Sequence, residues 1–250
     1  RNFTFVPASP CTLKVVIPDQ ICPMFDDNNT QFYQNVNEPL KYGKHPEDEL
    51  FQTDVLILDG KKNTFTPHFN YKGFQYVEVS SDKPLEQDKQ DMTSHFIHTD
   101  LPQIGTFECS DSLINRLWRA TNYSYLSNLV GYPTDCPHRE KNGWTGDAHL
   151  AIETALFNYD GITLYEKWLA DHRDNMYENG RLHCIIPSGG WGSDIVDWTC
   201  SVTLIPWAIY EFYGDQTCLR DNYTEMKRHT DYWLSKFPEG LVGDAGLGDW

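Results

Sequence analysis

The sequence predicts a multidomain protein of β plus α class, with a β-sandwich domain over residues 1–106 and an all-helical domain over residues 107–250. Two observations predict this division. In the first part, short runs of branched and aromatic residues are separated by clusters of Gly, Pro, Asn and Asp, which is typical of strands. From about residue 110 the apolar residues recur at helical spacing instead.

The runs with strand composition lie at residues 13–17, 54–58, 74–79 and 95–98. Their regular spacing favours a β-sandwich. Residues 26–52 are polar and carry no apolar pattern, which predicts a long loop.

Helical periodicity predicts five helices, at residues 113–129, 147–156, 162–177, 200–213 and 216–236. Ser110 or Asp111 can cap the start of the first helix, and the third ends near Gly180. Pro206 lies in the first turns of the fourth helix or kinks it. Because no strand interrupts the series, we expect stacked antiparallel helix pairs, as in bundles, solenoids and α/α toroids.

Composition and charge exclude several classes of function. No run of about 18 apolar residues occurs, so no segment is expected to span a membrane. The net charge of −16 argues against nucleic acid as a partner, because phosphate binding needs a basic face. A neutral carbohydrate remains compatible with this charge. Aromatic residues make up 14% of the chain, which favours carbohydrate binding, although most of these rings will belong to the core.

The cysteines do not indicate a metal site. Seven are scattered along the chain without a Cys-x-x-Cys pair, so zinc-site spacing is absent. We expect most of them to be free and buried, and we expect no metal and no cofactor. The chain begins at Arg1 without a Met, shows no signal peptide and stops at Trp250 in mid-pattern, so we expect a piece of a longer protein.

The most informative segment is residues 132–149. Its prolines and glycines exclude regular structure and predict a shaped loop. The loop holds three carboxylates with an arginine and a tryptophan between them: Asp135, Arg139, Glu140, Trp144 and Asp147. Carboxylates can bind sugar hydroxyls or transfer protons, and an aromatic ring can stack on the apolar face of a pyranose.

Glycosidic hydrolysis needs one carboxylic acid for the leaving oxygen and a second carboxylate to activate water or to attack. Glu140 is the best candidate for the acid. Its cationic neighbours Arg139 and Lys141 would lower its pKa, so burial or a nearby carboxylate must raise it. Asp135 or Asp147 is either that neighbour or an acceptor for sugar hydroxyls.

The same residues have plainer explanations, which spacing alone leaves equally open. Asp135 can cap a turn, Asp147 can be the N-cap of the next helix, and Arg139 with Glu140 can form a solvated surface pair. Cys136 lies two residues from His138, but no second pair stands at ligand spacing, so a metal site is disfavoured. Packing is a better explanation of Cys136 than a nucleophilic thiol.

Two further aromatic–carboxylate groups lie between predicted helices, at residues 191–198 and 248–250. In a toroid such loops gather at one end, so Trp144, Trp198 and Trp250 can line one pocket. The alternative is three unrelated core tryptophans.

The stretch from Asp135 to Ala148 resembles the signature loop of the family 78 glycoside hydrolases, the inverting α-L-rhamnosidases. Residues 65–79 resemble the last sandwich strands of that family, and residues 105–118 resemble the first helix of its catalytic domain. Trp198, with residues 206–207 and 214–215, is similar to its next barrel segment, and residues 249–250 are similar to a further one. The likeness runs from about residue 50 to the end.

The resemblance implies a β-sandwich followed by the first half of an (α/α)6 toroid. It makes Glu140 the general acid and assigns sugar binding to Asp135, Arg139, Trp144, Asp147, Trp198 and Trp250. The catalytic base would be a glutamate in later helices beyond Trp250, so we expect no turnover from these residues alone. The chain departs from the family at His138, where many members have Gln, and at Cys200, where members often have Asp. It also has one acidic residue, Glu140, where members often have a pair.

We therefore expect removal of terminal α-L-rhamnose from a rhamnosylated glycan or glycoside. The alternatives are an (α/α)6 glycosidase acting on another neutral sugar and a non-catalytic glycan-binding homologue. By analogy with other glycan-degrading enzymes, we expect a periplasmic or extracellular location.

Overall fold

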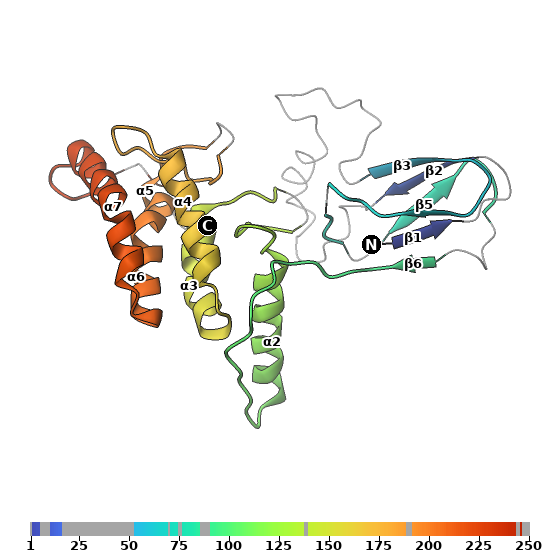
Figure 1. The fold of residues 1–250 in the computed structure, drawn as a ribbon, viewed down its shortest axis with the longest axis horizontal. Helices are drawn as coiled ribbons and strands as arrows, with labels where there is room; N and C mark the ends of the chain where they lie inside the picture. Colours follow the sequence, from blue (N-terminus) through green and yellow to red (C-terminus); the bar gives the residue numbers. More distant parts are fainter. Residues whose placement is uncertain are drawn as a thin grey trace. The chain divides into compact units, whose positions relative to one another are not determined.

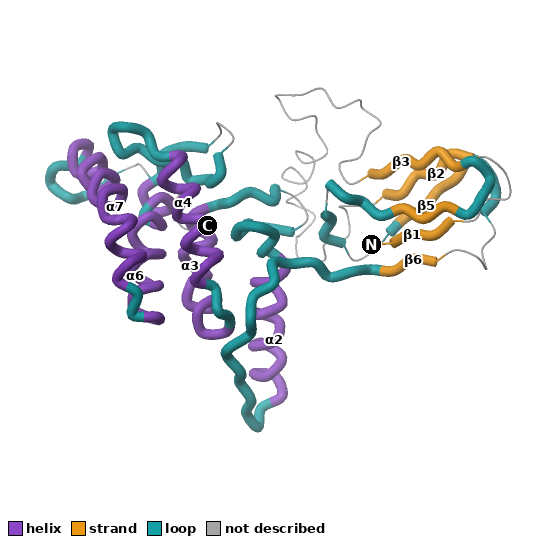
Figure 2. Tube along the Cα trace, viewed as in Figure 1, coloured by secondary structure: helices purple, strands orange, loops and turns teal. Residues whose placement is uncertain are grey.

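The computed structural model describes residues 2–5, 11–16, 53–69, 71–74, 77–85, 91–137, 140–188, 192–243 and 246. The chain forms two compact units, which divide between Phe96 and Ile97. Among the described residues, the strands lie in the first unit and the helices in the second (Figure 2).

The first unit contains two three-stranded sheets with antiparallel pairing throughout. One sheet has the order β4-β1-β6, formed by Asn63–Phe65, Asn2–Phe5 and Asp91–Thr93. The other has the order β3-β2-β5, formed by Thr53–Leu58, Cys11–Val16 and Glu78–Ser81 (Figure 1).

The small core of this unit lies against the central strand β2. Cys11, Val15 and Leu58 are buried there. Along β3 the side chains alternate, because successive residues point to opposite faces of a sheet. Leu58 therefore faces the core, whereas Ile57 is 87% exposed and Val55 62% exposed.

Sequence patterns predicted the larger sheet better than the smaller one. The strands expected at 13–17 and 54–58 are confirmed, with shifted ends, as β2 and β3. Of the described part of the run at 74–79, Glu78 and Val79 belong to a strand, β5, while residues 75–76 lie outside the described residues. The strand expected at 95–98 is wrong, since these residues form no ladder. The short strands β1, β4 and β6 were not expected, and residues 26–52 lie outside the described residues.

The second unit contains the five expected helices and one additional short turn. They are α2 (Ser112–Ser127), α3 (Thr145–Asn158), α4 (Ile162–Asn175), α5 (Val196–Thr199), α6 (Ser201–Tyr213) and α7 (Gln216–Lys236). Local caps explain several of the ends. The Asp111 side chain accepts from the Leu113 N–H at 2.8 Å, which confirms Asp111 as the first cap. Gly214 ends α6 in a left-handed conformation, and Asp215 caps α7.

Long and short connections alternate along this unit. The turns at residues 159–161 and 214–215 are short, so each reverses the chain between neighbouring helices. Helices α6 and α7 lie side by side as a result (Figure 1). The long connections, at residues 128–144 and 176–195 and after α7, must then share the opposite end of the helices.

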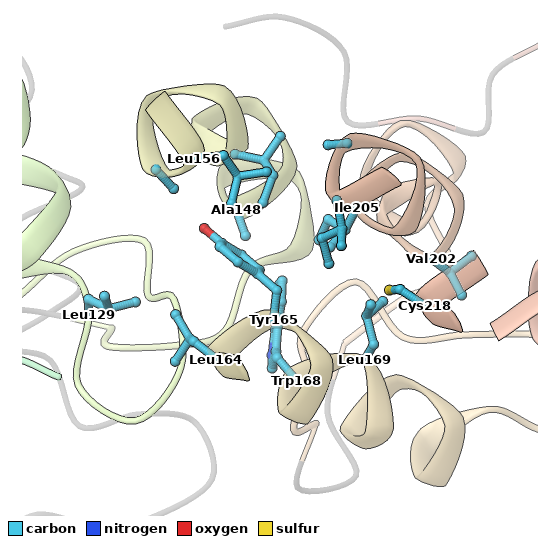
Figure 3. Close-up of a cluster of buried hydrophobic side chains, with 14 of the residues drawn as sticks. Leu129, Ala148, Leu156, Leu164, Tyr165, Trp168, Leu169, Val202, Ile205 and Cys218 are labelled. Atoms are coloured by element: carbon cyan, nitrogen blue, oxygen red, sulfur yellow. The ribbon is translucent and has the colours of Figure 1, made fainter. Parts of the chain in front are cut away.

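The core of the helical unit is centred on α4. Tyr165, Trp168 and Leu169 are fully buried and point toward side chains of α3 and α6, including Ala148 and Ile205 (Figure 3). Burying side chains of this size stabilises the fold by about 1.5–3 kcal/mol each. The Trp168 indole also donates to the carbonyl oxygen of Ile186 at 2.9 Å, which ties the core to the long connection above it.

Helix α2 is less enclosed than its periodicity predicts. Tyr125 is buried, but Leu113, Ile114 and Leu117 are each about half exposed among the described residues. The six described cysteines are free, as expected, but only Cys11, Cys184 and Cys218 are buried. None of the described helices has the length and apolar character needed to cross a membrane.

Candidate active site

The connection between α2 and α3 folds back on itself through backbone contacts. The Asp135 N–H donates to the Asn142 carbonyl oxygen at 3.1 Å, and the Asn142 N–H donates to Asp135 Oδ1 at 2.9 Å. Asp135 therefore does hold a turn, as its plainer explanation proposed. The Thr134 N–H, in turn, donates to the carbonyl oxygen of Asn128 at 2.8 Å. These contacts give the loop a fixed shape without regular structure.

A left-handed residue follows Glu140. Lys141 has φ of 55°, a conformation that is uncommon for residues other than glycine. Just before it, the backbone N–H of Glu140 donates to Cys136 Sγ at 3.2 Å. Cys136 thus serves as an acceptor inside the turn that presents Glu140. This contact supports a structural role for Cys136, as the sequence favoured.

Glu140 and Trp144 form a hydrogen-bonded unit. The Trp144 indole N–H donates to Glu140 Oε2 at 2.8 Å, and this orients both the ring and the carboxyl group. Glu140 is exposed, so the burial expected for it is not found. The charge of Glu140 contributes to the raised pKa values of Asp135 and Asp147.

Asp135 and Asp147 share a cavity of about 490 Å³. Its walls include Tyr125 of α2 and Tyr165 of α4. Burial raises the pKa of the Asp135 carboxyl, with a smaller contribution from the charge of Glu140. The same two causes raise the pKa of Asp147, although its side chain opens onto the cavity and is exposed. Carboxyl groups with raised pKa values beside a cavity are typical of functional sites.

The N-cap explanation of Asp147 is wrong. Helix α3 begins at Thr145 behind Trp144, so Asp147 lies within its first turn. A carboxylate at this position interacts favourably with the helix dipole. The sequence placed the helix start at Asp147 because the apolar repeat begins there, whereas tertiary contacts extend the helix back to Thr145.

Backbone contacts join the α2–α3 loop to the next long connection. Trp144 and Ile185 form an antiparallel bridge, and the Ile186 N–H donates to the Gly143 carbonyl oxygen at 2.8 Å. A Cβ at Gly143 would lie 1.9 Å from the Ile186 carbonyl oxygen, so only glycine permits this approach. The third long connection joins them, because a Cβ at Gly246 would lie 2.8 Å from Asp197 Oδ2. The loops therefore gather at one end, as expected for a toroid.

Trp198 lies close to Asp147, but neither Trp198 nor Trp144 is among the residues that line the cavity, so a single pocket lined by the tryptophans stays a prediction. The Trp198 ring packs on Gly146, and its indole N–H contributes to the electrostatic environment of Asp147. Among the described residues, no acceptor stands in full hydrogen-bonding geometry to this buried nitrogen. Arg139, His138 and Trp250 lie outside the described residues.

Asp194, one of the two carboxylates of residues 191–198, has structural partners instead. Asp194 is contacted by Lys236 Nζ at 2.8 Å, by the Tyr232 hydroxyl, and by Arg181 Nε at 3.5 Å. Burial alone would raise the pKa of Asp194, but the hydrogen bonds from Lys236 and Tyr232 outweigh it and lower that pKa. Asp194 therefore anchors the loop to α7.

Sequence reasoning missed the residues that join the loops. Thr145 is fully buried, and its hydroxyl lies 3.0 Å from the Cys184 carbonyl oxygen and 2.9 Å from that of Trp198. His149 Nε2 lies 2.9 Å from the Asp197 carbonyl oxygen. No local pattern marks such residues, because their partners are more than thirty positions away. The described residues hold no group of three His, Cys, Asp or Glu that could bind a metal ion.

The arrangement matches known protein families. Residues 102–250 match the family described as the bacterial alpha-L-rhamnosidase 6 hairpin glycosidase domain. Residues 29–98 match the bacterial alpha-L-rhamnosidase concanavalin-like domain. The chain is 36% identical over 205 residues to an alpha-L-rhamnosidase of Formosa agariphila, a match that covers 77% of this chain and 21% of that protein.

Solved structures agree with these matches. The alpha-L-rhamnosidase from Dictyoglumus thermophilum has a TM-score of 0.76 and 28% identity, with 100% of this chain and 27% of that chain covered. The Streptomyces avermitilis alpha-L-rhamnosidase complexed with L-rhamnose has a TM-score of 0.73 and 25% identity, covering 100% and 23%. The chain thus spans about a quarter of these structures. A β-sandwich followed by part of a six-hairpin toroid is confirmed, and the chain belongs to the bacterial alpha-L-rhamnosidase family.

Proposed function

We propose that this protein hydrolyses terminal α-L-rhamnosides by single displacement, with Glu140 as the general acid. Three observations support the proposal: the family membership, the Glu140–Trp144 unit, and the cavity lined by Asp135 and Asp147. The chain spans only 21% of the Formosa agariphila relative, so the activity concerns the intact protein.

The observation that carries the acid assignment is the hydrogen bond from the Trp144 indole to Glu140 Oε2 at 2.8 Å. An indole N–H can only donate, so it occupies this oxygen as an acceptor. The second oxygen, Oε1, then carries the proton that the acid delivers. As the bond between C1 and the leaving oxygen breaks, this proton passes to that oxygen and the aglycone leaves as an alcohol.

Water attacks C1 from the opposite face and gives its proton to a second carboxylate. We propose that this base lies outside these 250 residues, as the family resemblance implies. Asp135, Arg139 and Asp147 would bind the hydroxyls of the sugar. Trp144, Trp198 and Trp250 would contact its apolar face.

The decisive test is Glu140→Gln in the intact protein. Glutamine keeps the size of the side chain and an oxygen for Trp144, but it has no proton to donate. We expect kcat on an alkyl α-L-rhamnoside to fall by about 10²–10⁴-fold, the range for loss of a general acid. The affinity for L-rhamnose should change by less than about threefold. Glu153→Gln, an exposed carboxylate of α3, is the matched control.

Leaving-group dependence makes the test specific for an acid. From a rhamnoside of a strongly acidic phenol, the phenolate leaves without being protonated. The kcat of Glu140→Gln on such a substrate should therefore be far less reduced. An equal loss on both substrates would instead mean that Glu140 acts in binding. Full activity on the alkyl rhamnoside would refute the assignment.

The alternatives correspond to other outcomes. Turnover of another neutral α-glycoside but not of rhamnosides would identify a different sugar specificity. Binding of L-rhamnose without turnover by the wild-type protein would identify a glycan-binding homologue. A periplasmic or extracellular location stays a prediction, and cell fractionation tests it.

A further inference from the structure

The glycine at position 146 has a specific neighbour. An added Cβ would lie 2.5 Å from both Cε2 and Nε1 of Trp198 and 2.6 Å from its Cδ1. Real Cβ atoms essentially never approach other atoms so closely. The indole of Trp198 therefore rests directly on the backbone of α3, and any side chain at position 146 would occupy the same space.

Backbone conformation does not explain this glycine. Gly146 lies in the first turn of α3 and is not among the residues with positive φ. At a helical position alanine is favoured over glycine, because glycine loses more conformational entropy on folding. The close approach of the ring is thus the physical reason that position 146 requires glycine.

The segment that carries the ring is held at the same place. The Thr145 hydroxyl lies 2.9 Å from the carbonyl oxygen of Trp198, and Thr145 is fully buried. One turn later, His149 Nε2 lies 2.9 Å from the carbonyl oxygen of Asp197. These two contacts prevent the backbone of α5 from moving away from α3. An obstacle at position 146 must therefore rotate the Trp198 side chain.

The consequence falls on the neighbouring carboxylate. Asp147 follows Gly146 directly, and the Trp198 indole N–H lowers its pKa in part while burial raises it. The same N–H is buried without a full hydrogen-bond partner among the described residues, so it remains able to donate. Asp147 lines the cavity and Trp198 does not, so the ring acts on the cavity through the carboxylate that it contacts.

We propose that Gly146 is a positioning residue, which sets the Trp198 ring against Asp147 and so fixes the placement of that carboxylate at the cavity. The inference rests on the proposed function, because Asp147 and Trp198 are the predicted sugar contacts. Gly146 touches no substrate in this proposal. It acts through the ring that it admits.

The test is a double-mutant cycle with Gly146→Ala and Trp198→Ala in the intact protein. Gly146→Ala should weaken binding of L-rhamnose at least tenfold, measured by calorimetry, and should raise KM on an aryl rhamnoside more than it lowers kcat. Trp198→Ala removes the ring that the new Cβ would strike, whereas a phenyl ring would keep carbon atoms at the same place. In the Trp198→Ala background, Gly146→Ala should therefore weaken binding further by less than threefold.

Gly161→Ala is the matched control. Gly161 is the N-cap of α4, and its added Cβ would lie 3.3 Å from Tyr165 Cε2 and 3.8 Å from Leu156 Cδ2, with no approach to Trp198. L-rhamnose affinity should change by less than twofold. If Gly146→Ala keeps wild-type affinity, or if its effect is the same in both Trp198 backgrounds, the inference is wrong.

Further measurements distinguish a failure of this inference from misfolding of the variant and from a failure of the proposed function. If Gly146→Ala does not fold, as judged by circular dichroism, adding Trp198→Ala should restore folding, and failure to restore it contradicts the inference. If the wild-type protein neither binds L-rhamnose nor cleaves rhamnosides, the proposed function fails. The position of the ring is then followed by the part of the fluorescence that Trp198→Ala removes: Gly146→Ala should shift its emission, and unchanged emission refutes the positioning.

Discussion

The loops at residues 132–149 and 181–198 have similar compositions, yet their carboxylates are used in opposite ways. In the first loop, burial raises the pKa values of Asp135 and Asp147. In the second, burial acts in the same direction on Asp194, but Lys236 and Tyr232 reverse it and lower the pKa. Ionised Asp194 therefore stabilises the fold, whereas ionised Asp135 and Asp147 cost stability.

The difference lies in what the neighbouring helix supplies. Helix α7 presents a lysine and a tyrosine to Asp194. Within the part of the chain that the structure describes, no ion pair involves Asp135 or Asp147. A carboxylate without a cation keeps its hydrogen-bonding capacity for a ligand, at a cost to the fold. A carboxylate paired with a cation, as Asp194 is with Lys236, stabilises the fold.

The largest expected effect on stability comes from a buried histidine of α4. His172 is fully buried between α4 and α6, with Nδ1 2.8 Å from the Trp168 carbonyl oxygen and Nε2 3.1 Å from Ser201 Oγ. Burial lowers its pKa to about 4, against 6.5 for the unfolded chain. Between these values the unfolded state binds more protons, so stability falls as the pH drops through this window. The loss is on the order of 3 kcal/mol by pH 4.

Urea unfolding of the intact protein at pH 7 and pH 4.5 measures this loss. His172→Gln can keep a hydrogen bond to Ser201 but cannot titrate, so it should lose markedly less stability over the same range. Equal losses in the two proteins would show that other groups control the acid response.

The next effect concerns the carboxylate that we assign to the sugar. Asp147→Asn should lower the affinity for L-rhamnose about a hundredfold, since hydrogen bonds to a charged group contribute about 1.5–3 kcal/mol. The melting temperature at pH 7 should stay the same or rise, because burial disfavours the ionised form. Calorimetry and thermal unfolding measure the two effects. Asp174→Asn, at an exposed position of α4, should change neither. Reduced stability with unchanged affinity would reverse the assignment.

The opposite pattern is expected at the anchored carboxylate. Asp194→Asn should cost about 1–2 kcal/mol of stability at pH 7, because it weakens the charge-assisted bonds from Lys236 and Tyr232. The affinity for L-rhamnose should stay within twofold. Since the pKa of Asp194 is lowered, the wild-type advantage should vanish as the pH falls through that lowered pKa. Thermal unfolding in steps from pH 7 to pH 2 tests this, and a difference that does not shrink as the pH falls below the ordinary range of an aspartate would contradict it.

The smallest expected effect on stability is the loss of an exposed ion pair, which can be compared with the loss of the partners of Asp194. Lys167 and Asp171 pair at 2.5 Å on α4, with the lysine side chain 61% exposed. Lys167→Met should cost about 0.3 kcal/mol, because solvent and salt screen such pairs and this order of charges is the weaker one on a helix. The cost should disappear in 0.5 M salt. If Lys167→Met lost as much stability as Asp194→Asn, an exposed ion pair would stabilise the fold as much as the bonds to Asp194. The comparison of the two loops would then fail.

Most of the helical unit could be predicted because its information is local. Apolar spacing located the five long helices, and Asp111 marked a cap. The strands β1, β4 and β6 could not be predicted in the same way. They have three or four residues each, and their pairing partners lie far away in the sequence, as Phe3 opposite Phe65 illustrates.

The sequence by itself determined the class of fold, the loop at residues 132–149 and the candidate residues within it, because periodicity, turn residues and motif spacing are local properties. Only the tertiary structure decided which carboxylates stabilise the fold, since Asp194 binds Lys236, which lies more than forty positions away in the sequence. It also decided that Gly146 must lack a side chain, since Trp198 approaches it from a different helix. Contacts of this kind depend on three-dimensional packing, which no window of neighbouring residues records.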